Sequence, residues 1–190
     1  MKTIVYLHGF VSSPQSKKAV MLGDYLRNVV GGIDYAVPEL HHRPQRAIGQ
    51  VEAACRGRSR DDLTLVGSSL GGFYATVMAE RLGCRAALLN PAVHPHAHFE
   101  RYLGPQRNLY TGEEFELTRA HVDELRALDP AAITRPERYW LFVETGDVTL
   151  DYRDAVAYYK DALHTVVRGG DHTLVSFPEH VPEIVDWAKS

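Results

Sequence analysis

Apolar and polar positions along the chain follow two different periods. Six short runs are rich in β-branched and aromatic residues and are bounded by glycine, proline or asparagine, which is typical of buried strands. We expect strands at residues 3–7, 33–37, 63–66, 85–89, 139–145 and 164–167. The run at 33–37 ends at a proline, which indicates a position nearer the edge of a sheet.

Between these runs, apolar residues recur at intervals of three and four, the period of an amphipathic helix. We expect helices at residues 14–29, 45–56, 70–82, 118–128, 150–162 and 178–189. Ser13 is the expected N-cap of the first helix, with Pro14 in its first turn. Strands that alternate with helices predict an α/β fold, with a mostly parallel sheet of about six strands and helices on both faces.

One segment interrupts this alternation. From Ala92 to about Arg138 the periodicity is poor, apart from the helix expected at 118–128. The segment follows the fourth expected strand, and functional groups in such folds gather at the carboxyl ends of the strands. We therefore expect a single domain over residues 1–190 with a small cap or lid at about 92–138. Several residues within this segment either pack it onto the core or line a pocket: Phe99, Tyr102, Leu103, Leu109, Tyr110 and Phe115.

A serine lies between two glycines where the third expected strand gives way to a helix. Gly67-Ser68-Ser69-Leu70-Gly71 fits the pattern G-x-S-x-G of a nucleophile elbow, in which the central serine projects above the sheet edge. Ser69 is therefore the candidate nucleophile. Because glycine and serine are common turn residues, the pentapeptide is also compatible with a plain strand-to-helix turn. The residues at the other strand ends have to decide between the two interpretations.

Two further strand ends supply the groups that a nucleophilic serine needs. His172 follows the last expected strand, and an imidazole is well matched to accept a hydroxyl proton near pH 7. Asp147 follows the fifth expected strand and is the candidate that orients the histidine, with Asp151 as a rival carboxylate in the same loop. We favour Asp147 because it is nearer the strand end and because Asp151 suits the first turn of the next helix. The order Ser69, Asp147, His172 is that of the α/β-hydrolases.

A serine of this kind also needs two backbone N–H groups that face the developing oxyanion. One expected donor is the N–H of Leu70, at the N-terminus of the helix after the serine. The second is expected from the loop His8-Gly9-Phe10, with the N–H of Phe10 as first choice and that of Val11 as the alternative. His8 itself is expected to be a structural hydrogen-bonding residue rather than an acid or base.

Six motifs follow one another along nearly the whole chain: His8-Gly9-Phe10 with Ser12-Ser13-Pro14, Gly67-Ser68-Ser69-Leu70-Gly71-Gly72, Asn90-Pro91-Ala92, Tyr110-Thr111-Gly112, Thr145-Gly146-Asp147 with Leu150-Asp151-Tyr152, and Gly169-Gly170-Asp171-His172. Together they resemble the YqiA/YcfP family of small α/β-fold esterases. The resemblance implies a trimmed α/β-hydrolase fold and the hydrolysis of carboxylic esters or thioesters. It implies Ser69 as nucleophile, Asp147 as acid and His172 as base. Asp171 departs from the family pattern, where asparagine is expected, and this change can tune the imidazole.

The net charge, the apolar runs and the cysteines bear on which partners the protein binds and where in the cell it lies. The formal net charge of −3 gives no electrostatic footprint for nucleic acid, and the apolar runs are too short to span a membrane. The N-terminal apolar run is too short for a signal peptide, and Cys55 and Cys84 are expected to be reduced core residues. We therefore expect a cytoplasmic protein.

The sequence predicts neither a cofactor nor a metal. His94, His96 and His98 have the spacing of metal ligands on a strand, but nearby prolines disfavour a regular strand and no carboxylate or cysteine is close in sequence. A loop of solvated or substrate-facing histidines is the better interpretation. The serine elbow lacks the lysine of a phosphate-binding loop, and no G-x-G-x-x-G follows a strand.

These features predict a cofactor-free serine esterase or thioesterase that acts on a small-molecule acyl ester or thioester through an acyl-enzyme. The alternative is a non-catalytic binding protein with an α/β-hydrolase fold. Such a protein has no need to retain all three of Ser69, Asp147 and His172.

Overall fold

Six parallel strands form the central sheet of the computed structural model, which describes residues 1–190. Their order across the sheet is β2-β1-β3-β4-β7-β8, and every neighbouring pair is parallel. The strands are β1 (Thr3–Leu7), β2 (Asp34–Ala36), β3 (Leu63–Ser68), β4 (Arg85–Leu89), β7 (Tyr139–Glu144) and β8 (Leu163–Val167). The parallel sheet predicted from the sequence is therefore confirmed.

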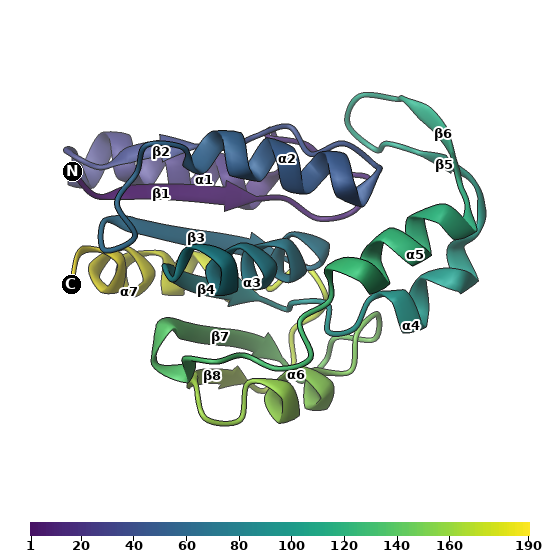
Figure 1. Cartoon of the computed structure of the whole chain (residues 1–190). Helices are drawn as coiled ribbons and strands as arrows, with labels where there is room; N and C mark the ends of the chain where they lie inside the picture. The colour runs from purple at the N-terminus through teal and green to yellow at the C-terminus, as the bar shows by residue number, and fades with distance from the viewer.

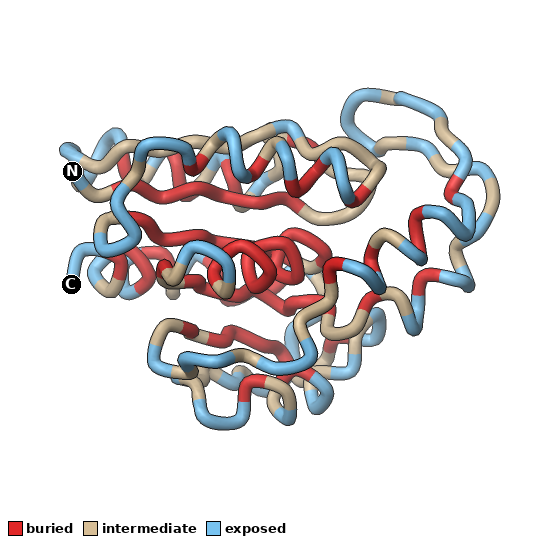
Figure 2. The backbone as a smooth tube through the Cα atoms, in the orientation of Figure 1, coloured by how far each residue is buried: buried red, intermediate tan, exposed pale blue.

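Helices cover both faces of this sheet (Figure 1). On one face, where Ile4 and Tyr6 of β1 point, lie α1 (Lys17–Tyr25) and α7 (Phe177–Lys189). On the other face, where Val5 and Leu7 point, lie α2 (Pro44–Cys55), α3 (Leu70–Leu82) and α6 (Tyr152–Tyr158). Because successive side chains of a strand point to opposite faces, a strand covered on both sides is apolar throughout. Figure 2 shows the result: all five residues of β1 are buried.

Both cysteines lie in the core on the face of α2 and α3. Cys55 and Cys84 are unpaired and buried. Burial raises the pKa of the Cys55 thiol to about 11 and that of the Cys84 thiol to about 12. Neither side chain is a thiolate at neutral pH, so both act as small apolar core residues.

The start of the first helix differs from the prediction. α1 begins at Lys17, with Ser16 at its N-cap position, so the expected cap at Ser13 is wrong. The hydroxyl of Ser13 accepts a hydrogen bond from the N–H of Gln15, and its carbonyl accepts one from the N–H of Ser16. These two bonds form a separate turn ahead of the helix. At its other end, α1 continues into a π-helical turn at Leu26–Val30.

From α4 (His96–Phe99) to α5 (Arg119–Leu128) the segment between β4 and β7 lies beyond the carboxyl ends of the strands, and it then returns to the opposite edge of the sheet, where β7 begins (Figure 1). It contains α4, η2 (Glu100–Tyr102), the antiparallel strands β5 (Gly104–Arg107) and β6 (Glu114–Leu117), α5 and η3 (Pro136–Arg138). The sequence predicted α5 but not the hairpin, because β5 and β6 are short and mostly polar and β5 contains a proline. No helix anywhere in the structure has the length and apolar character needed to cross a membrane.

Candidate active site

β3 passes into α3 with Ser69 as the only connecting residue. The backbone of Ser69 has a positive φ of 55°, a conformation that non-glycine residues rarely adopt. Two glycines permit this tight connection. A Cβ on Gly67 would lie 2.3 Å from the carbonyl oxygen of Gly71, and a Cβ on Gly71 would lie 2.1 Å from that of Leu7. A side chain at either position would push α3 away from the sheet.

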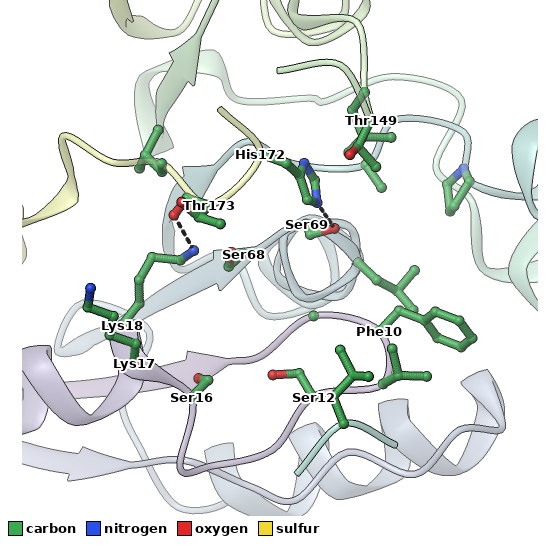
Figure 3. Close-up of a pocket in the computed structure, with 18 of the residues that line it drawn as sticks. Phe10, Ser12, Ser16, Lys17, Lys18, Ser68, Ser69, Thr149, His172 and Thr173 are labelled. Carbon is green, nitrogen blue, oxygen red and sulfur yellow. Dashed lines mark hydrogen bonds between the residues drawn. The ribbon is translucent and has the colours of Figure 1, made fainter. Parts of the chain in front are cut away.

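The side chains of Ser69, His172 and Asp147 form a continuous chain of contacts. The Nε2 atom of His172 lies 3.0 Å from the Oγ atom of Ser69 (Figure 3), and its Nδ1 atom lies 2.7 Å from Oδ2 of Asp147. The side chain of His172 is 28% exposed and that of Asp147 only 1%, so the imidazole is accessible while the carboxylate is shielded from water. When Nδ1–H donates to the carboxylate, Nε2 is free to accept the hydroxyl proton of Ser69.

The two rival carboxylates of the loop after β7 have different partners in the structure. Oδ1 of Asp147 accepts hydrogen bonds from the N–H groups of Thr149 and Leu150, at 2.8 Å and 2.9 Å, and these bonds hold Oδ2 toward His172. Asp151 instead occupies the N-cap of α6, where its side chain accepts from the N–H of Arg153. Only Asp147 contacts the histidine, in keeping with the preference drawn from the sequence.

Both expected sources of an oxyanion donor flank Ser69. The loop after β1 lies against it, since a Cβ on Gly9 would be 3.4 Å from the Cβ of Ser69. The N–H groups of Phe10 and Val11 in this loop donate to no backbone carbonyl. The N–H of Leu70, at the first position of α3, has no partner within the helix.

His8, at the start of the same loop, is buried and serves the backbone. Its Nδ1 atom lies 3.0 Å from the carbonyl oxygen of Gly9, and its Nε2 atom accepts a hydrogen bond from the N–H of Leu40 at 3.1 Å. Burial lowers the pKa of His8 below the usual range for histidine. The ring therefore remains neutral near pH 7 and ties the loop after β1 to the loop after β2.

A cavity of about 730 Å³ lies over Ser69 and His172. Toward the segment 92–138 its wall is mainly apolar and includes Phe10, Leu70, Val93, Phe99, Tyr102 and Leu150. Toward α1 and α7 it carries apolar side chains, among them Met21 and Phe177, together with hydroxyl groups and two lysines that are labelled in Figure 3: Ser12, Ser16, Lys17, Lys18, Ser68 and Thr173. No aspartate or glutamate lines the cavity, whereas Lys17, Lys18 and Arg101 do.

Most of the residues singled out in the segment 92–138 either line the cavity or pack on the fold, but Leu103 does neither and is 37% exposed. Those that line the cavity are Phe99, Tyr102, Leu109 and Tyr110. The ring of Phe115 instead stacks on His42, with ring centroids 4.3 Å apart. The segment therefore contributes to the cavity wall and is also fastened to the rest of the fold by aromatic packing.

His94 and His96 both approach one carboxylate that is distant in sequence, and the Nδ1 atom of His96 lies 2.9 Å from Oδ2 of Asp129. His94 Nδ1 lies 2.8 Å from Oδ2 of Asp129, a carboxylate at the end of α5 that the sequence spacing did not reveal. His96 and His98 lie in α4 rather than in the expected loop, and His98 lines the cavity. His42, in the loop before α2, has its Nδ1 atom 3.0 Å from Nε2 of His121.

Two buried polar residues at strand ends were missed by the sequence analysis. Asn90 directly follows β4 and Glu144 ends β7, and both form hydrogen bonds with the loop that carries His172. An ionisable residue at the end of a buried apolar strand requires partners, because an unpaired buried charge is costly. That rule could have marked Glu144 from the sequence.

Residues 3–189 match the family model described as "Uncharacterised protein family (UPF0227)". The UPF0227 protein of Serratia proteamaculans (strain 568) is 30% identical over 98 residues, and that of Klebsiella pneumoniae (strain 342) is 31% identical over 98 residues. Each alignment covers 51% of this chain and 54% of the relative, so the chain is matched to about half the length of these curated relatives.

Several solved structures share the fold. Alpha/beta hydrolase domain-containing protein 10 from mouse has a TM-score of 0.76 at 14% identity, with 98% of this chain and 89% of that chain covered. Est1E from Butyrivibrio proteoclasticus has a TM-score of 0.69 at 15% identity, covering 99% and 88%. A monoacylglycerol lipase from Paleococcus ferrophilus has a TM-score of 0.69 at 15% identity, covering 98% and 93%. These similarities establish an α/β-hydrolase fold.

Proposed function

The chain belongs to the UPF0227 family, the YqiA/YcfP family whose motifs its sequence resembles, and we propose that it is a serine hydrolase of carboxylic esters or acyl thioesters. The observation that carries this proposal is the continuous contact from Ser69 through His172 to Asp147 beneath a cavity of about 730 Å³. A plain strand-to-helix turn would need neither the histidine nor the carboxylate. The names of the structural neighbours, an esterase and a lipase among them, support the same class of reaction.

In the first half of the reaction, Ser69 attacks the acyl carbonyl carbon. As the bond from Oγ to this carbon forms, Nε2 of His172 takes the hydroxyl proton and the carbonyl π electrons move onto oxygen. Asp147 holds the imidazole in the required tautomer and stabilises the imidazolium. Collapse of the tetrahedral intermediate breaks the bond to the leaving group, which receives the proton from His172 and departs as an alcohol or thiol.

The negative charge of the intermediate falls on the former carbonyl oxygen. In our proposal, this oxyanion accepts hydrogen bonds from the N–H of Leu70 and the N–H of Phe10, with Val11 as the alternative second donor. A single donor of this kind typically contributes on the order of 3 kcal/mol to transition-state stabilisation. Both donors lie beside Ser69, one in the loop after β1 and the other at the first position of α3.

In the second half, water replaces the leaving group. His172 removes a proton from water as its oxygen attacks the acyl carbon, and the second tetrahedral intermediate collapses by breaking the bond to Oγ. The proton returns to Ser69, and a carboxylic acid leaves. The proposed chemistry needs only the side chains of Ser69, His172 and Asp147, backbone N–H groups and water.

The cavity suggests the general nature of the substrate. Its apolar wall, to which Phe10, Phe99 and Tyr102 contribute, suits an aliphatic or aromatic acyl group. The opposite wall has hydroxyl groups and lysines, and no carboxylate faces either part. We therefore propose neutral or anionic substrates rather than cationic ones.

We also propose that the segment 92–138 acts as a small cap within a single domain.

A fluorophosphonate probe tests the proposed function directly. Labelling followed by peptide mapping should place one adduct on Ser69 and none on the neighbouring Ser68. The variant His172→Ala, which lacks the general base, should lose the labelling while it remains folded. Folded wild-type protein that takes no label would contradict the proposal and would favour the non-catalytic binding protein.

A further inference from the structure

The loop that carries His172 is fastened to one buried carboxylate. Glu144 is 1% exposed and lies at the end of β7. Its Oε2 atom accepts hydrogen bonds from the N–H of Asp171 at 2.7 Å and that of Val175 at 3.0 Å, and its Oε1 atom accepts one from the N–H of Ser176 at 2.7 Å. These donors lie on both sides of His172 in the sequence. A single side chain thus fixes both arms of the loop.

Asn90, which directly follows β4, holds the same loop through its carbonyl groups. Its Nδ2 atom donates to the carbonyl oxygen of Asp171 at 3.0 Å and to that of His172 at 3.3 Å. Its Oδ1 atom accepts from the N–H of Glu144 at 3.0 Å. Asn90 and Glu144 therefore form one connected network that reaches the backbone of the histidine itself.

The loop has a backbone shape that depends on such support. Leu174, a buried residue, has a positive φ of 56°, and Gly170 has a φ of 67°. Conformations of this kind persist in non-glycine residues only where the surroundings hold them. The fit is also close, since a Cβ on Gly170 would lie 1.9 Å from Oε2 of Glu144. The carboxylate and the loop are shaped to each other.

The ionised form of Glu144 fits these contacts. Burial raises the pKa of its carboxyl group, but the hydrogen bonds from Ser176, Asp171 and Val175 outweigh this effect and hold the pKa below its usual range. An ionised carboxylate accepts hydrogen bonds and donates none, which matches the three backbone donors that face it.

A lysine also reaches the loop, because the ammonium of Lys18 donates to the carbonyl oxygen of Thr173 at 2.7 Å (Figure 3).

We infer that Glu144, together with Asn90, is a positioning residue that sets the place of the His172 imidazole relative to Ser69. The inference rests on the proposed function, in which His172 is the base. Asp147 follows Glu144 by three residues on the same strand end. The end of β7 therefore holds the histidine twice, at its ring through Asp147 and, through Glu144, by the loop backbone on either side of it. Neither Glu144 nor Asn90 lines the cavity, so neither contacts the substrate.

The variant Glu144→Gln tests this role, because it keeps the size of the side chain but turns an N–H₂ group toward backbone N–H donors. We expect kcat for p-nitrophenyl acetate to fall by about 100-fold, the effect of misplacing a reacting group by about 1 Å, while KM changes less than about twofold.

Glu80→Gln is the matched control. Glu80 accepts hydrogen bonds from the hydroxyl and N–H of Thr134 and from the hydroxyl of Tyr139, which begins β7 at the end opposite Glu144. This variant should lose thermal stability as Glu144→Gln does, yet retain the kcat of the wild type. If Glu144→Gln retains kcat within about twofold, or if the two variants lose activity in proportion to their stability, the inference is wrong.

Two further measurements keep the test decisive. If Glu144→Gln does not fold, Asn90→Ala, which removes the bonds to the carbonyl oxygens of Asp171 and His172, should give the same drop in kcat at unchanged KM, and unchanged kcat would overturn the inference. Amide hydrogen exchange should be faster for Asp171, Val175 and Ser176 in either variant. A wild-type protein with no activity but with protected loop amides would disprove the proposed function, whereas active variants would disprove only the positioning role.

Discussion

Nε2 of His172 lies 3.0 Å from Oγ of Ser69, although the two residues are 103 positions apart in the sequence. Ser69 follows β3, whereas His172 follows β8, and β4 and β7 lie between these strands in the sheet. The histidine loop must therefore reach back across two strand ends. Those two ends carry Asn90 and Glu144, the residues that bind the loop.

Ser69→Ala should abolish ester hydrolysis without unfolding the protein. Removing the nucleophile of a serine hydrolase costs at least about three orders of magnitude in turnover. The variant keeps the backbone of the elbow and loses only the hydroxyl group, so its circular dichroism and thermal transition should match those of the wild type. Turnover of p-nitrophenyl acetate that equals the wild-type rate would refute the assignment of Ser69.

Asp147→Asn should reduce kcat far more than Asp151→Asn. The first change removes the acceptor that fixes the tautomer of His172 and stabilises its charge, an effect of up to about 10⁴-fold in related sites. The second removes a helix N-cap, which costs on the order of 1 kcal/mol of stability and leaves the site intact. Kinetics of both variants at one pH, each corrected for the folded fraction, compare the two roles. A larger loss in Asp151→Asn would assign the acid to the other carboxylate.

Stability should decline as the pH falls below about 6.5, because His42 and His121 are neutral in the folded state. Burial, followed by the charges of His41 and His121, lowers the pKa of His42; burial, followed by the charge of Arg43, lowers that of His121. Glu113 and Glu124 oppose these effects. A folded-state pKa below the unfolded value means that the unfolded chain binds more protons. The stabilisation is therefore complete above the unfolded pKa and is lost as the pH falls toward the folded one.

Urea unfolding between pH 7.5 and pH 5 measures this effect, with a slope of at most about 1.4 kcal/mol per pH unit for each histidine. His42→Phe keeps a ring against Phe115 and removes one titrating group, so its stability should depend less steeply on pH. A variant at position 42 with an unchanged slope would exclude His42 as a source.

Esters with a quaternary ammonium in the leaving group should be poorer substrates than neutral or sulfonated esters with the same acyl group. The charged side chains that line the cavity are Lys17, Lys18 and Arg101. We expect kcat/KM for the cationic ester to be about tenfold lower than for the neutral one, with the gap narrowing at high salt as the charges are screened. Equal rates for the three esters at low salt would contradict the proposed preference.

The sequence was informative about strands and their ends because both follow local rules. A buried parallel strand is continuously apolar, and glycine or proline marks where it stops. The parallel order of such a fold then brings Ser69, Asp147 and His172 to one edge, before any distance is known. This is why three residues separated by long stretches of chain could be grouped from the sequence, and why their contacts agree with that grouping.

The features that were missed depend on long-range contacts. The charge of Glu144 at the end of a buried strand signals that it needs partners, but the sequence does not reveal which ones, because the N–H groups of Asp171, Val175 and Ser176 carry no residue-specific signal. The β5–β6 hairpin is polar and short, so its pairing leaves no clear period in the sequence. The pairing of His94 with Asp129 likewise joins residues 35 positions apart.

The positive φ of Ser69 lowers the stability of the fold, while the proposed reaction requires the hydroxyl group at this position. A non-glycine residue held in such a conformation costs about 1–3 kcal/mol, whereas the whole fold is stable by only about 5–15 kcal/mol. Glycine at position 69 would relieve this strain, but it would also remove the hydroxyl group. Alanine would remove the hydroxyl group and keep the strain. The serine therefore persists at a position where stability alone favours glycine, and the well-packed sheet around it supplies the margin that allows this.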